Sequence, residues 1–165
     1  MARGEDDGQV VMSVFDRLLD DDPARGEDPR KTRGNALAEL RDALRRDLEA
    51  LLNTRPCSTT WERWLAELDE SILNYGVATV TNAELSANEN RERLRGAVER
   101  AIRRFEPRFL KVSVALLEDA DRIDRTLRFR IEALVRAEPT PEPLVFDSVV
   151  DPSTQGITVL SPRHV

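Results

Sequence analysis

The stretch AIRRFEPRFLKVSVALL, residues 101–117, contains the point at which the periodicity of the chain changes. Before Pro107 the apolar residues, among them Ile102 and Phe105, recur at helical spacing. After it, Phe109–Leu117 alternates or runs apolar, as a strand does. Proline disfavours helical geometry in the residue before it, so the helix is expected to end here. The stretch therefore predicts a helix that is followed directly by a strand.

Upstream of this joint the sequence predicts two more helices. The first covers residues 36–53, and the second covers residues 61–76 with Thr60 as its N-cap. The helix that ends at Phe105 is expected to begin at Ala83 or Asn88. Trp61 and Trp64 are interpreted as core anchors. The first helix has an apolar stripe at helical spacing, formed by Leu37, Leu40, Leu44, Leu48, Leu51 and Leu52.

Downstream of the joint, three further segments have the character of strands. They are Leu127–Val135, residues 144–150 and residues 157–160, and acidic or proline-containing stretches separate them. Helices that come first and strands that follow are typical of an α+β domain. We expect N-terminal helices packed on a small, mainly antiparallel sheet of about four strands.

The N-terminal part differs in character from the rest. Residues 1–35 are interpreted as an amphipathic segment and a flexible linker, and residues 36–165 as the main domain. The apolar side chains of the segment allow two interpretations, docking onto a partner protein or packing against the chain's own domain. The candidate docking residues are Val14, Phe15, Leu18 and Leu19.

Size and charge exclude several classes of function. With 165 residues the chain has the length of one ordinary domain. The 25 basic and 31 acidic residues give a net charge of −6, which disfavours a general nucleic-acid binder. Glutamates alternate with the arginines of the helix that ends at Phe105, so ion pairs are expected along it. No apolar run approaches the roughly 18 residues of a membrane span, and the N-terminus is not signal-like, so we expect neither membrane insertion nor export.

The chain contains one cysteine and one histidine, Cys57 and His164. These counts exclude an internal disulfide, a zinc site built from several such ligands, and a catalytic triad with a histidine inside the fold. Cys57 is expected to be inert and partly buried. Only carboxylate chemistry, or no chemistry, remains, and neither a cofactor nor a small-molecule substrate is expected.

Glu106, Pro107 and Arg108 form the most distinctive local pattern. A carboxylate and a guanidinium two residues apart, with a proline between them, can form a rigid pair that is presented to a partner. Alternatively, Pro107 only stops the helix and Glu106 pairs with a neighbouring arginine.

Five fragments in a fixed order make the sequence similar to a known family. It resembles the baseplate wedge family typified by the tail-sheath initiator of phage T4, often labelled lysozyme-like. Within that family it resembles the TssE subunits of bacterial type VI secretion systems. The fragments are residues 13–19 (SVFDRLL), 46–55 (RDLEALLNTR), 71–76 (SILNYG), 102–108 (IRRFEPR), and 129–131 (FRI) leading to 144–146 (LVF).

The resemblance implies a structural role in a cytoplasmic baseplate at the inner membrane, where a contractile sheath begins to polymerise. The implied partners are the wedge subunits TssF, TssG and TssK and the sheath subunits TssB and TssC. The resemblance also implies that Glu106, Pro107 and Arg108 contact the wedge core, and that strands from sheath subunits extend the sheet.

The alternative function is a peptidoglycan hydrolase. Glycoside hydrolysis uses two carboxyl groups on either side of a cleft. Glu106 could supply one, and Glu118 or Asp119 are the candidates for the second. The missing export signal and the few aromatic residues make this the weaker hypothesis, so we expect no enzymatic activity.

Overall fold

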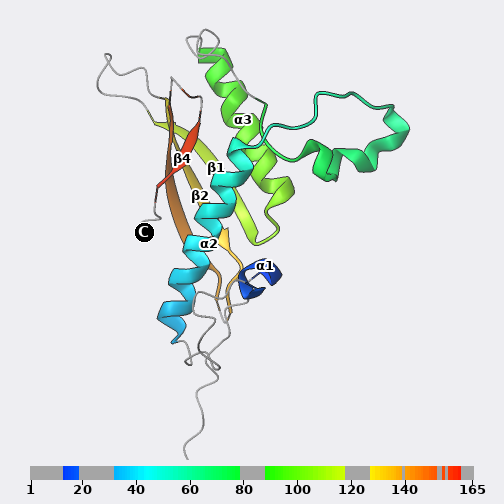
Figure 1. The fold of residues 1–165 in the computed structure, drawn as a ribbon. Helices are drawn as coiled ribbons and strands as arrows, with labels where there is room; N and C mark the ends of the chain where they lie inside the picture. Colours follow the sequence, from blue (N-terminus) through cyan, green and yellow to red (C-terminus); the bar gives the residue numbers. More distant parts are fainter. Residues whose placement is uncertain are drawn as a thin grey trace, which may run out of the picture.

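The computed structural model describes residues 13–18, 32–78, 88–117, 127–138, 140–151, 154 and 156–160. It confirms the α+β class, with helices packed on a four-stranded antiparallel sheet (Figure 1). Within these ranges no helix combines the length and apolar character that a membrane span needs. The elements in chain order are α1 (Val14–Leu18), α2 (Arg33–Asn53), the 3₁₀ helices η1 (Arg63–Glu70) and η2 (Ile72–Asn74), α3 (Asn88–Phe105), β1 (Phe109–Leu117), β2 (Leu127–Val135), β3 (Glu142–Val150) and β4 (Ile157–Val159).

Among the helices, α2 contributes the most buried residues to the core. It begins at Arg33, earlier than residue 36, because the Thr32 hydroxyl accepts a hydrogen bond from the Asn35 amide and caps it. Its leucine stripe lies against the sheet, as predicted, with only Leu37 half-buried. The buried residues of α2 are Leu40, Ala43, Leu44, Leu48, Leu51 and Leu52.

The sheet has the order β1-β2-β3-β4, and every neighbouring pair is antiparallel. Side chains of β2 alternate between buried and more exposed, so one face of the sheet packs on the helices. Strand β3 begins at Glu142, before the expected residue 144. Strand β4 pairs only with Ser148–Val150, since it is three residues long.

A β-bulge interrupts β1 directly after the helix-to-strand joint. Phe109 is paired with Val135 and Lys111 with Leu134, so Leu110 is an extra residue. Phe109 packs against the core beside Phe146, whereas Leu110 and Lys111 both point outward before Val112 is buried again. The bulge therefore brings both Phe109 and Val112 onto the core face.

Residues 54–74 form an arm that projects away from the body (Figure 1), before Tyr75 and Val77 pack against the core, and here three predictions are wrong. The expected single helix is two short 3₁₀ helices, because the backbone is extended at Ser71 between them (φ −81°, ψ 168°), and Leu65 kinks the first of the two (φ −97°, ψ 37°). Trp64 is not a core anchor but 78% exposed, since an arm without a core of its own has nothing to pack it against. Trp61 is half-buried and donates from Nε1 to Asp69. Cys57, expected to be partly buried, is exposed.

Gly76 closes the base of the arm. Its φ of +118° is unfavourable for other residues, and an added Cβ would lie 2.1 Å from the Thr54 carbonyl oxygen. That approach lets the Val77 amide donate to the same oxygen at 2.9 Å. The arm therefore leaves and rejoins the body at one point.

Three of the arginines of α3 form ion pairs along the helix, as expected. Four ion pairs link neighbouring turns of the helix, so this face is occupied by its own charges. They join Arg93 to Glu89, Arg95 to Glu92 and Glu99, and Arg103 to Glu99.

Candidate functional site

The turn after α3 holds Glu106, Pro107 and Arg108 in a fixed conformation. The Glu106 amide still donates to the Ile102 carbonyl at 2.9 Å, and the Phe109 amide donates to the Glu106 carbonyl at 3.2 Å. Pro107 lies in the turn and is exposed. Backbone hydrogen bonds on both sides therefore fix the position of the pair of charged side chains.

Glu106 and Arg108 bind each other. Arg108 donates from Nε to Glu106 Oε1 at 2.6 Å and from Nη2 to Oε2 at 2.5 Å, a two-point contact. Glu106 is only 6% exposed. The expectation of a presented pair is therefore wrong for Glu106, and the alternative pairing with a neighbouring arginine is present. The cause is the turn itself, which brings the two side chains together beneath α2.

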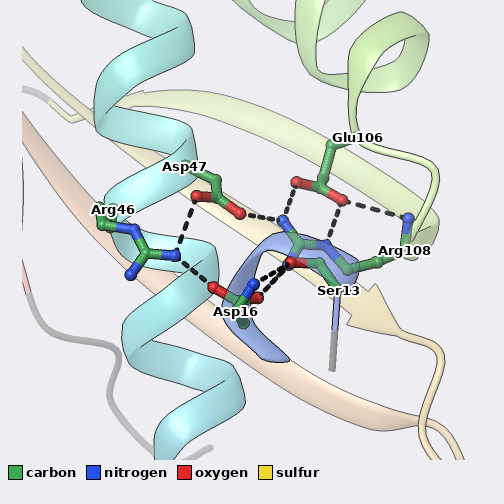
Figure 2. A network of polar contacts seen from close by, with 6 residues as sticks. All are labelled: Ser13, Asp16, Arg46, Asp47, Glu106 and Arg108. Atoms are coloured by element: carbon green, nitrogen blue, oxygen red, sulfur yellow. Dashed lines mark hydrogen bonds and ion pairs between the residues drawn. The ribbon is translucent and has the colours of Figure 1, made fainter. Parts of the chain in front are cut away.

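Helix α2 adds two charged residues to the pair. Arg108 Nη2 donates to Asp47 at 2.5 Å, and Arg46 lies 3.5 Å from the same carboxylate (Figure 2). Burial alone would lower the pKa of Arg108, but the hydrogen bonds to Glu106 and Asp47 raise it above its ordinary value. The guanidinium of Arg108 thus remains charged and joins α2 to the turn.

The short helix α1 completes the network through its polar side. Its Asp16 carboxylate accepts a hydrogen bond from Arg46 and lies 3.8 Å from Arg108 Nη1 (Figure 2). Ser13 donates to that carboxylate at 2.5 Å and accepts from the Asp16 amide, which caps the helix. Burial opposes ionisation, but the Ser13 and Arg46 hydrogen bonds lower the pKa of Asp16 overall. The Asp16 side chain is only 5% exposed.

The apolar side chains of α1 point away from the network. Val14 is 74%, Phe15 65% and Leu18 76% exposed. Leu19, the fourth candidate docking residue, lies outside the described residues, as does most of the expected linker. Of the two interpretations for this segment, packing of its apolar residues against the domain is therefore wrong for these three side chains.

A hollow of about 450 Å³ adjoins the network. Leu51, Tyr75, Phe105 and Pro107 give it an apolar lining, and Tyr75 and Phe105 pack edge to face with ring centroids 5.2 Å apart. Ser13, Asp47, Glu106 and Arg108 form its polar side. The arrangement suits an apolar side chain that carries or neighbours a hydrogen-bond acceptor.

Arg108, one of the residues on this polar side, has an unused donor. Arg108 Nη1 is buried and donates no hydrogen bond within the described part of the chain. Asp16 neutralises its charge from 3.8 Å, a distance beyond hydrogen-bond range.

The structure gives no support to the hydrolase hypothesis. Both oxygens of Glu106 accept hydrogen bonds from Arg108, so this carboxylate is engaged in an ion pair of the fold. Glu118 and Asp119 lie outside the described residues. Among the residues that are described, no group of His, Cys, Asp and Glu could hold a metal ion.

Comparison with known proteins gives one match. The sequence profile of the family described as baseplate wedge protein gp25 matches residues 38–140. The matched range runs from α2 to the residues before β3 and includes Glu106, Pro107 and Arg108, whereas α1, β3 and β4 lie outside it. No curated protein and no solved structure matches the chain.

Proposed function

Because the chain belongs to the gp25 family of baseplate wedge proteins, a structural family of phage-tail-like baseplates, we propose that it is the TssE subunit of a type VI secretion system. In this role it links the baseplate wedge to the contractile sheath, initiates sheath polymerisation and acts at the cytoplasmic face of the inner membrane. The match over residues 38–140 carries the proposal, and two of the fragments, residues 13–19 and the Leu-Asn-Tyr-Gly stretch at 73–76, favour the secretion subunit.

The proposed wedge contact is the surface around the 106–108 turn. Pro107 is exposed and Arg108 partly so, whereas the buried Glu106 positions Arg108 and is not itself a contact. The exposed Val14, Phe15 and Leu18 provide a second, apolar contact. Proposed wedge partners are TssF, TssG and TssK.

The proposed sheath contact, with TssB and TssC, is the outer edge of β3. The middle of the edge of β1 is occupied, since Arg103 and Arg95 of α3 donate to the carbonyls of Val112 and Val114. No described strand lies beside residues 142–146 on the β4 side, because β4 pairs with Ser148–Val150 only. The free edge therefore lies on β3. Strand β2 offers none, because it is a central strand with a neighbour on both sides.

A substitution at Val145 tests the sheath contact. The Asp147 carbonyl accepts from the Leu160 amide on the β4 side, so by alternation the backbone groups of Val145 face that side too. Val145→Pro removes this outward donor, and Pro143 already occupies an equivalent outward position. We expect sheath assembly on this protein to be lost while the melting temperature stays close to that of Val145→Ala. Normal assembly by Val145→Pro would contradict strand addition at β3.

Recovery of partners tests the function as a whole. A tagged copy expressed in the bacterium should co-purify stoichiometrically with wedge and sheath subunits. Purified protein should release no dye from labelled peptidoglycan at neutral or acidic pH. Dye release that disappears in Glu106→Gln, together with no recovered baseplate subunit, would favour the hydrolase.

A further inference from the structure

We propose that the place now held by Asp16 is a binding site for an acidic side chain of the wedge, and that α1 occupies this site only until the wedge binds. We call the space beside Arg46 Nη2 and Arg108 Nη1 the carboxylate site. The inference rests on the proposed function, because it specifies the chemistry of the partner at the 106–108 turn.

The first argument is the orientation of α1. An amphipathic helix that belongs to a core buries its apolar side, but α1 buries Asp16 and leaves Val14, Phe15 and Leu18 exposed. The ion pairs of Asp16 with Arg46 and Arg108 hold it to the body, and a helix held by such contacts is easy to release. Helix α1 is also only five residues long and lies outside the range matched by the family profile.

The second argument is that Asp16 fills the carboxylate site incompletely. It binds Arg46 but stays 3.8 Å from Arg108 Nη1, which is left buried without a hydrogen bond among the described residues. An unmade hydrogen bond of a buried charged donor is costly. A carboxylate that reaches both guanidinium groups would therefore bind more favourably than Asp16 does.

The chemistry of the partner follows from what the site already accepts. Asp16 shows that a carboxylate is tolerated here, and the two guanidinium groups would repel a basic side chain. The adjoining hollow offers Leu51, Phe105 and Pro107 to an apolar side chain. The fitting partner is thus a wedge segment with an Asp or Glu next to a residue such as Leu or Phe.

Two substitutions with opposite expected effects test the exchange. Asp16→Asn removes the charge that competes for the carboxylate site, whereas Arg46→Gln removes part of the site itself. Asp42→Asn, an exposed position on α2, is the control with the same charge change as Asp16→Asn. The measurements are NMR amide shifts of Val14–Leu18 in the free protein and the Kd for the purified wedge complex.

We expect both Asp16→Asn and Arg46→Gln to release α1, seen as shifts typical of an unfolded segment. Asp16→Asn should lower the Kd, by about tenfold if α1 covers the site in about nine of ten free molecules. Arg46→Gln should raise the Kd at least severalfold, and Asp42→Asn should change neither readout.

The other outcomes each have a defined meaning. A higher Kd for Asp16→Asn would show that docked α1 is part of the wedge surface, and unchanged α1 shifts would show that Asp16 does not hold the helix. Either result overturns the exchange and leaves the proposed function intact. No binding of the wedge by wild type or any variant would instead refute the proposed function, and with it the partner assigned here.

Discussion

Helices α1 and α2 have similar amphipathic sequences but dock in opposite senses. Helix α2 is 21 residues long and packs its leucines against the sheet. Helix α1 has five residues, buries Asp16 and exposes its apolar side chains. Amphipathic periodicity predicted both helices, yet it did not predict which side of each faces the domain. The side that faces the domain depends on whether the domain offers apolar surface where the helix lies.

The two modes of docking differ in free energy. Burial of one leucine side chain contributes about 1.5–3 kcal/mol, and α2 buries several. Ion pairs near the surface contribute about 0–1 kcal/mol each. Helix α2 is therefore part of the folding unit, whereas we expect α1 to leave without unfolding the domain. The following predictions test this difference, beginning with the largest effect.

Leu48→Ala in α2 should produce the largest loss of stability. Leu48 is 1% exposed, and removal of its side chain leaves a cavity that costs about 2–5 kcal/mol. Thermal and urea unfolding should show this loss, while Leu37→Ala at the half-buried position costs clearly less. Equal effects of the two substitutions would mean that α2 is not anchored by its buried stripe.

Glu106→Ala should produce the second-largest loss of stability. It leaves the guanidinium of Arg108 with Asp47 as its remaining close partner, and the lost charged hydrogen bonds are worth about 1.5–3 kcal/mol. A urea denaturation curve measures the change, with the exposed Glu92→Ala as control. An unchanged unfolding free energy would restore the idea of a presented pair.

Acid should release α1 before it affects the packing of α2. The lowered pKa of Asp16 means that its ion pairs stabilise docking above the pKa of an unfolded Asp, about 4, and that this contribution is lost as the pH falls through the lower folded value. NMR shifts of Val14–Leu18 should stay constant from neutral pH to about pH 5 and change below about pH 4. In Asp16→Asn the transition should be absent, and its persistence there would assign it to another group.

Phe15→Ala should have the smallest effect on stability. At 65% exposure the ring contributes little to the fold, so we expect a change within about 0.5 kcal/mol. The same variant should bind the wedge more weakly if the apolar side of α1 is a contact. A melting temperature lowered as far as that of Leu48→Ala would show that α1 packs through its apolar side after all.

The sequence predicted the regular elements well because their patterns are local. Phe109–Leu117 and Leu127–Val135 have the expected bounds. Strand β3 extends over Pro143, which was treated as a break, because Pro143 faces outward and interrupts no pairing with β2. The arm was mispredicted because helical spacing of Trp61 and Trp64 does not reveal whether a core lies beside them.

The charged network could be predicted only in part. The turn residues Glu106 and Arg108 were found because they are adjacent in sequence. Asp16, Arg46 and Asp47 were missed, because pairing across 30 to 61 positions leaves no local signal in one sequence. The one local signal for Asp16 was its spacing from Ser13, which fits the capped start of a helix.

The bulge at Leu110 lets the joint between helix and sheet accommodate one extra residue without a change of face. Leu110 is 43% exposed, so many side chains would be accepted there. Without the bulge, the three-residue spacing between Phe109 and Val112 would turn Phe109 and everything before it to the opposite face of the sheet. The bulged backbone, and not the side chain of Leu110, therefore keeps Phe109 on the core face and Arg108 beside α2.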